Sequence, residues 1–112
     1  MKRTTILSAA AMLALSSQQS LAADISVEVQ NLTHGLYFTP IAAVIHTPDV
    51  SLFEVGEAAS TELQMMAEGG SIDGITTVAT AASADMIANP AGGLLAPTMS
   101  ASGDVMTTDG NV

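Results

Sequence analysis

The chain has no cysteine and only two basic residues, and each of these shortages excludes a class of protein. Without cysteine it can form neither a disulfide framework nor a thiolate metal cluster. Two Lys and Arg stand against 11 Asp and Glu, and the formal net charge is -9. The chain therefore lacks the clustered cations that bind nucleic acid phosphates, and we expect no nucleic acid partner. Its 112 residues leave room for at most one small domain.

Long hydrophobic runs are also lacking, since no segment reaches the ~20 apolar residues of a membrane-spanning helix. The apolar residues 6–15 follow Lys2 and Arg3 and precede a polar stretch that ends in Ser20-Leu21-Ala22. This order is typical of a secretory signal peptide. We predict a signal peptide over residues 1–22, cleaved after Ala22 or after the next alanine. The expected location is secreted or periplasmic, with no integral membrane segment after cleavage.

Both basic residues lie in this leader, which changes the charge of the remaining domain. Residues 23–112 are 90 residues that keep all 11 carboxylates and have no Lys or Arg, so their formal charge is -11. Such a chain cannot form a Lys or Arg salt bridge within itself. Its carboxylates must face water, accept hydrogen bonds or hold cations.

The hydrophobic pattern predicts several strands and one helix. Residues 24–32 alternate apolar and polar side chains, which predicts a half-buried strand. The apolar run 41–45 has the length of a core strand, and residues 98–105 are β-prone. Ala59, Leu63 and Met66 share a helical face and predict one short helix near residues 57–68.

Residues 71–84 leave the choice between helix and strand open. Ile72, Ile75 and Val78 have helical spacing, whereas Thr76 and its neighbours favour a strand.

Short motifs follow one another in a defined order between residues 25 and 97. They are Asn31-Leu32-Thr33, Gly35, Phe38 and Pro40, then His46-Thr47-Pro48, Leu52-Phe53-x-x-Gly56, Ala59-Ser60-x-Glu62-Leu63, Ala67-Glu68-Gly69 and Gly92-Gly93-Leu94-Leu95-Ala96-Pro97. In order and spacing this series resembles the spondin N-terminal domain of bacterial secreted proteins. The resemblance implies a mainly β fold, an antiparallel β-sandwich with a short helix between strands.

The same resemblance implies an extracellular role, because spondin domains occur in matrix and adhesion proteins, some of which bind calcium. It predicts a non-enzymatic binding or adhesion-type module whose partner is an unknown protein or surface ligand. In the family, further strands follow an acidic-Gly turn, and this chain ends inside that turn. Residues 23–112 are therefore expected to be the N-terminal part of the family domain, a truncated and incomplete sandwich.

No catalytic motif is present: there is no G-x-S-x-G, H-E-x-x-H, P-loop or G-x-G-x-x-G. His34 and His46 fall in predicted turns, where contact with backbone carbonyls is favoured over a general-base role. We therefore predict that the protein is not an enzyme. Asn31 matches the N-glycosylation pattern, but in a bacterial protein it is expected to be only the polar end of a strand.

Calcium is the one cofactor that the donor set favours, because it takes hard oxygen ligands. The candidate ligands are Asp104, Asp109 and Asn111, of which the last two flank a glycine. The alternative is that they are ordinary turn residues, since Asp and Asn favour turns for backbone reasons. The alternative function is an acidic exported structural or surface protein that becomes ordered with calcium or salt.

Overall fold

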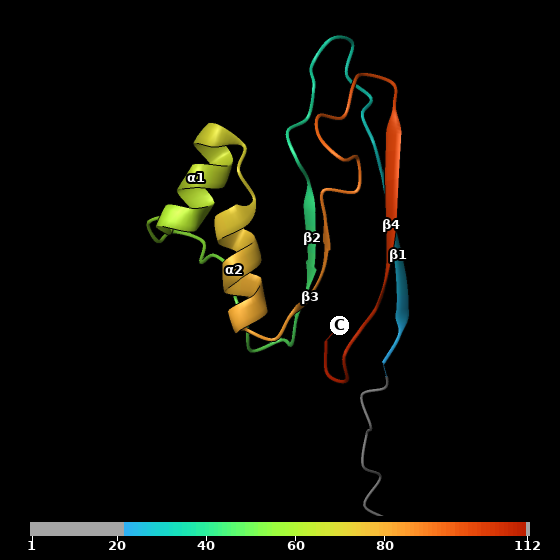
Figure 1. Ribbon diagram of the computed structural model, residues 1–112. Helices are drawn as coiled ribbons and strands as arrows, with labels where there is room; N and C mark the ends of the chain where they lie inside the picture. Colours follow the sequence, from blue (N-terminus) through green and yellow to red (C-terminus); the bar gives the residue numbers. More distant parts are fainter. Residues whose placement is uncertain (1–21, 112) are drawn as a thin grey trace, which may run out of the picture.

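The computed structural model describes residues 22–111, so the predicted signal peptide lies almost wholly outside the described residues. Of the described residues 20% are in helices and 27% in strands, which supports a mainly β fold only loosely. No helix within the described range is long and apolar enough to cross a membrane. Figure 1 shows the elements in chain order: β1 (Asp24–Gln30), β2 (Ala42–Ile45), α1 (Thr61–Gly69), α2 (Asp73–Ala81), β3 (Asp85–Ala88) and β4 (Ser100–Met106).

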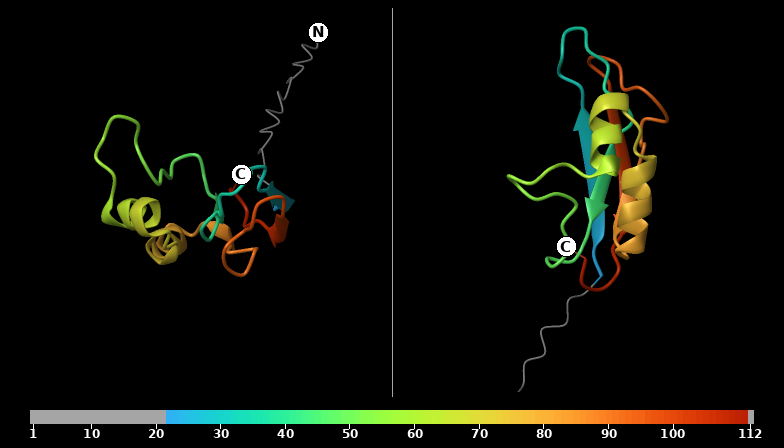
Figure 2. Two further views of the ribbon diagram at one scale, coloured as in Figure 1. Left: turned by 90° about the horizontal axis from the view of Figure 1, so that it is seen from above. Right: turned by 90° about the vertical axis from the view of Figure 1, so that its left-hand side faces the viewer.

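The strands form two antiparallel sheets of two strands each. β1 pairs with β4 from Asp24↔Met106 to Gln30↔Ser100, and β2 pairs with β3 over four residues. The β2–β3 sheet lies between the helices and the β1–β4 sheet (Figures 1 and 2). The helices therefore cover one side of the β2–β3 sheet only.

The predicted strands are confirmed with small shifts at their ends. The strand predicted over residues 24–32 is β1, and its side chains alternate between exposed and half-buried as expected. The runs 41–45 and 98–105 correspond to β2 and β4. A further β-prone stretch near Phe38 forms only an isolated bridge to Leu95.

The helical region departs from the prediction in two ways. α1 begins at Thr61 rather than near residue 57, because the Ser60 hydroxyl caps it by accepting from the backbone N–H of Leu63 at 3.2 Å. The prediction of one helix is also wrong, since α2 is a second. In α2 the Thr76 hydroxyl donates to the carbonyl of Ile72 at 2.8 Å. This bond gives the hydroxyl a partner within the helix, although threonine by itself favours a strand.

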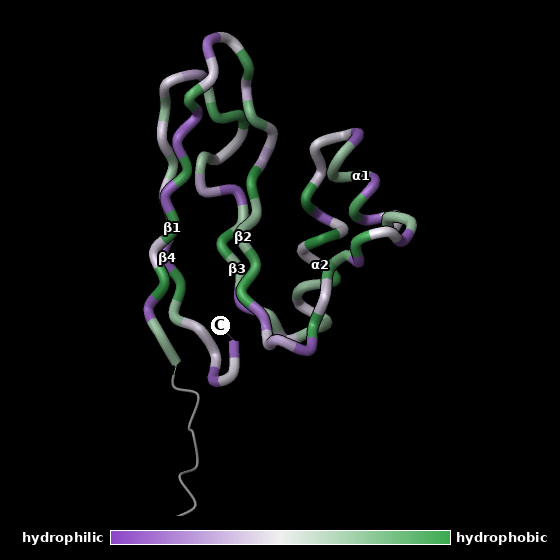
Figure 3. The backbone as a smooth tube through the Cα atoms, turned by 180° about the vertical axis from the view of Figure 1, so that it is seen from behind, coloured by the Kyte–Doolittle hydropathy of each residue, from purple (hydrophilic) through white to green (hydrophobic). Residues whose placement is uncertain are grey.

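The apolar core is concentrated on the helix side of the molecule. Figure 3 shows mainly hydrophobic residues along β2 and β3, whereas β1 alternates. The two sheets approach closely at Gly103 of β4, where an added Cβ would collide with the side chain of Ile87 of β3. The buried apolar residues are Ile45, Ile72, Ile75, Ala79, Ile87, Leu95 and Ala101.

Candidate interaction surface on the β1–β4 sheet

One face of the β1–β4 sheet is polar and acidic. The register places Asp24 opposite Met106, Ser26 opposite Asp104, and Glu28 opposite Ser102. All six of these side chains are exposed. Since residues 22–111 contain no Lys or Arg, no basic side chain in that range neutralises the three carboxylates. We refer to Asp24, Ser26, Glu28, Gln30, Ser100, Ser102, Asp104 and Met106 as the outer face.

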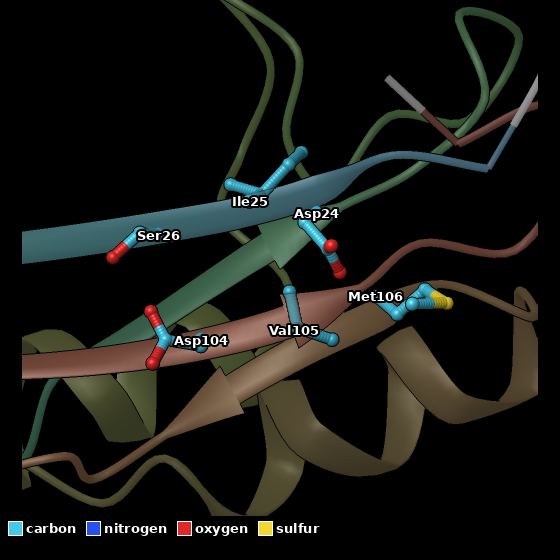
Figure 4. Close-up of a pocket in the computed structure, with 6 residues that line it drawn as sticks. All are labelled: Asp24, Ile25, Ser26, Asp104, Val105 and Met106. Carbon is cyan, nitrogen blue, oxygen red and sulfur yellow. The ribbon is translucent and has the colours of Figure 1, made fainter.

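A shallow pocket of about 280 Å³ lies at one end of this sheet. Figure 4 shows Ser26 of β1 and Asp104 of β4 across from one another on neighbouring strands. The pocket combines hydroxyl and carboxylate oxygens with apolar side chains. Its lining residues are Asp24, Ile25, Ser26, Asp104, Val105 and Met106.

The opposite face of β1 is apolar and only half-buried. Ile25, Val27 and Val29 point to this side, which we call the inner face. Their partners across the sheet are Val105, Gly103 and Ala101 respectively. Of these six residues only Ala101 is buried, at 9% exposure. The inner face of β1 thus retains apolar surface that the chain's own core does not cover.

β1 has one paired edge and one unpaired edge, because it pairs only with β4 among the described residues. At its two ends, Thr107 N–H donates to the carbonyl of Ala23 at 2.8 Å and Asn31 N–H donates to the carbonyl of Met99 at 2.9 Å. Antiparallel pairing alternates the direction of successive backbone groups. The intervening odd-numbered residues therefore point their N–H and C=O groups toward β4. The groups that point to the unpaired edge belong to Asp24, Ser26, Glu28 and Gln30.

Asn31 fixes one end of this sheet, a role that the sequence interpretation missed. Its side chain is fully buried, at 0% exposure. The amide donates to the carbonyls of Leu36 at 2.6 Å and Leu95 at 2.9 Å, and its oxygen accepts from the N–H of Thr33 at 3.0 Å. The available signal was Asn followed two residues later by Thr, which is typical of a side chain that bonds its own turn. Asn31 thus directly follows β1, as the polar end of the strand, and its buried side chain holds the turn after it.

At the other end of the β1–β4 sheet, Asp85 of β3 binds the segment that follows β4. Its carboxylate accepts from the backbone N–H and the hydroxyl of Thr108, and from the side-chain amide of Asn111 at 2.8 Å. These bonds, that of Asn111 first, hold the pKa of the Asp85 carboxyl below its ordinary value of 3.8. Asn111 is itself buried and donates to the carbonyl of Ser83 at 3.0 Å. We call Asp85, Thr108 and Asn111 the C-terminal clasp.

The three predicted calcium ligands do not meet in one place. Asp104 lies on the outer face, whereas Asp109 Oδ1 accepts from the N–H of Ala22 at 2.9 Å. The Asn111 amide belongs to the C-terminal clasp. Within the part of the chain that the structure describes, no group of three or more His, Asp or Glu is placed to hold a metal ion. A calcium site at these residues remains a prediction that would need them to rearrange.

His34 lies in a bend of the loop after β1, as predicted, whereas His46 directly precedes the turn that Val50 N–H closes on the carbonyl of Thr47. His46 Nδ1 lies 2.8 Å from the carbonyl of Thr47, a distance at which the ring N–H donates to the backbone. Thr47 also hydrogen-bonds the Asp49 carboxyl and, with a smaller effect from His46, lowers the pKa of that carboxyl below 3.8. His34 is exposed in the loop after β1. Neither arrangement pairs a histidine with a serine nucleophile.

A second cavity, of about 250 Å³, lies between β2, the following loop and the helices. All the side chains that line it are apolar, so none of them could act as an acid, base or nucleophile. It is a gap in the packing on the helix side. The lining residues are Ala42, Val44, Leu52, Phe53, Leu63, Met66 and Ile75.

Comparison of the chain with protein-family models, with curated proteins and with solved structures finds no significant match. The spondin resemblance therefore stays a prediction from the sequence motifs.

Proposed function

We propose that this protein is an exported, non-enzymatic binding or adhesion-type module, secreted or periplasmic, of the spondin N-terminal kind. The observation that supports this best is the β1–β4 sheet, which combines an acidic outer face, a half-buried apolar inner face and an unpaired edge. Protein surfaces that bind partners typically combine apolar area with polar groups around it. In this proposal the two sheets form an open β-sandwich that meets at Ile87 and Gly103.

Export is tested by expressing the full-length sequence in a bacterial host and fractionating the cells. We expect a product in the periplasm or medium whose mass corresponds to cleavage after Ala22 or Ala23. A matched variant, Lys2→Glu with Arg3→Glu, removes the positive region of the leader and is expected to leave the uncleaved chain in the cytoplasm. An uncleaved native chain in the cytoplasm would contradict export.

The non-enzymatic part of the proposal is supported by the positions of the histidines. His46 donates to a backbone carbonyl, and His34 lies in an exposed loop. The purified protein is expected to be inactive on ester, peptide, glycoside and phosphate-ester substrates. A hydrolase activity that is abolished by His46→Ala and retained by His34→Ala would contradict it.

The alternative is an acidic exported structural or surface protein that is ordered by calcium or salt, and the charge of the chain favours it. Eleven carboxylates without a Lys or Arg in residues 23–112 repel one another at low ionic strength. Circular dichroism in low salt separates the two functions. A folded spectrum that neither calcium nor salt changes would refute the alternative, and an unfolded spectrum restored by calcium would support it.

A further inference from the structure

We infer that the unpaired edge of β1 binds an extended, Lys- or Arg-rich segment of a partner protein, which adds to the β1–β4 sheet as a third strand. This inference rests on the proposed binding function and names the class of partner. Strand addition to an exposed sheet edge is a recurrent mode of peptide recognition. The occupant follows from three properties of β1: its free backbone groups, its inner face and its charge.

The free backbone groups of β1 provide the hydrogen-bond donors and acceptors for an added strand. Asp24, Ser26, Glu28 and Gln30 direct their N–H and C=O groups away from β4, so a segment laid along β1 finds a donor and an acceptor at every second residue. β1 is seven residues long, whereas β2 and β3, which also have one unpaired edge each, have four. Figure 2 shows no other helix or strand along the side of β1 that faces away from β4.

The inner face of β1 selects apolar side chains at alternate positions of the partner. Ile25, Val27 and Val29 are half-buried, and an added strand would place its inward side chains directly beside them. Covering this surface removes apolar area from water, which is the main favourable term in association. The free edge of β4 is less suited to this, because its inner face has Gly103 pressed against Ile87.

The outer face selects positive charge at the remaining positions. Outward side chains of the added strand would lie next to Asp24 and Glu28, with Asp104 on the strand beyond. Opposite charges on neighbouring strands stabilise pairing, whereas like charges weaken it. The same charge argues against a second copy of this chain, because each copy has 11 carboxylates and no Lys or Arg in residues 23–112. The partner is therefore a segment that alternates basic and apolar residues.

The probe for this inference is an acetylated and amidated peptide of alternating Lys and Val, long enough to pair with all of β1. We expect saturable binding to the exported protein, with NMR amide shifts concentrated on residues 24–30. A peptide of alternating Glu and Val keeps the apolar face and reverses the charge, so it should not bind. A peptide with the same Lys and Val in blocks keeps the charge and loses the alternation, so it should bind at least about tenfold more weakly.

Two variants of the protein separate edge pairing from simple charge attraction. Ser26→Pro removes one outward N–H and places a ring on the free edge, where β4 pairing is untouched, and should raise the dissociation constant about tenfold or more. Asp24→Asn with Glu28→Gln should weaken binding several-fold and flatten its dependence on salt. Their circular dichroism spectra and melting temperatures should match those of the native protein.

Three results would overturn the inference. The peptide with Lys and Val in blocks could bind as tightly as the alternating peptide, or the amide shifts could spread over the whole acidic surface. Light scattering could also show a dimer that Ser26→Pro abolishes, which would mean that a second copy already occupies the edge of β1. In each case export and the lack of hydrolase activity would still stand. Failure of the strand-addition inference is thus distinguishable from failure of the proposed function.

Discussion

The β2–β3 sheet and the β1–β4 sheet have the same number of strands but are stabilised in different ways. The β2–β3 sheet has helices on one side, and with them it contributes Ile45, Ile75 and Ile87 to the core. The longer β1–β4 sheet contributes one buried residue, Ala101. Its two strands are held by their backbone pairing over seven residues and by hydrogen-bonded side chains at its ends, Asn31 and the C-terminal clasp. The helix side therefore holds most of the buried apolar core, whereas the β1–β4 sheet keeps apolar side chains that are only half-buried.

The largest expected effect comes from removing the Asn31 anchor. Asn31→Ala removes the four hydrogen bonds of a fully buried side chain, two of them to the carbonyls of Leu36 and Leu95, and should lower the free energy of unfolding by about 3 kcal/mol. Urea denaturation followed by circular dichroism measures this. The matched control is Gln30→Ala on the exposed face next to it, which should stay within about 0.5 kcal/mol of the native protein. Equal effects of the two substitutions would show that Asn31 does not anchor the sheet.

The contact between the two sheets is tested at Gly103. Gly103→Ala forces a methyl group into the side chain of Ile87, and overpacking of this kind costs about 1–3 kcal/mol. Gly35→Ala is the control, since an added Cβ there has no heavy atom within 4 Å. Adding Ile87→Ala to Gly103→Ala should cost less than the sum of the single changes. Strict additivity would contradict the close approach of the two sheets.

The C-terminal clasp should make a smaller, pH-dependent contribution. Folding lowers the pKa of Asp85 below 3.8, so its stabilisation is complete above that pH and is lost as the pH falls through the lowered value. Asp85→Ala should therefore lower the melting temperature at pH 7, and the difference from the native protein should shrink toward pH 2. Glu54→Ala, at an exposed loop position, is the control. A difference that persists unchanged at low pH would rule out the carboxylate as its cause.

The smallest expected effect is that of calcium over other salts. Asp104 lies on the outer face, Asp109 is hydrogen-bonded to Ala22, and Asn111 is hydrogen-bonded to Asp85, so the three do not form one calcium site. Calcium, magnesium and sodium chloride at equal ionic strength should therefore raise the melting temperature alike, by screening the carboxylates. Thermal denaturation in the three salts measures this. A calcium-specific increase that Asp109→Asn removes would instead establish the predicted calcium site.

Local patterns in the sequence predicted three of the four described strands, β1, β2 and β4, but not β3 (Asp85–Ala88). The alternation over residues 24–32 defines β1, because a strand with one buried face must alternate. The start of α1 was predicted too early, since the cap at Ser60 rather than the apolar spacing decides it. α2 could not be decided from residues 71–84 alone. Its helical form depends on burial of Ile75 and Ala79 against the rest of the core.

The anchors of the β1–β4 sheet could not be predicted, because they join distant parts of the chain. Asn31 bonds to Leu95, 64 residues away, and Asp85 bonds to Asn111, 26 residues away. The residues around Asn31 and Asp85 do not indicate which distant residues these side chains bind. Asn111 was predicted as a calcium ligand from its place in a turn, whereas in the structure its amide is a donor in the clasp. The sequence thus indicated the type of residue at these sites but not the contacts that they make.

The most direct test of the difference between the sheets is NMR-detected hydrogen exchange of the amides in β1. If one edge is paired and the other is free, Ile25, Val27 and Val29 should exchange slowly, whereas Asp24, Ser26 and Glu28 should exchange nearly as fast as loop amides. Such alternation along one strand would confirm a free, accessible edge. Uniform protection of all six amides would show that the edge is already covered and would contradict this account.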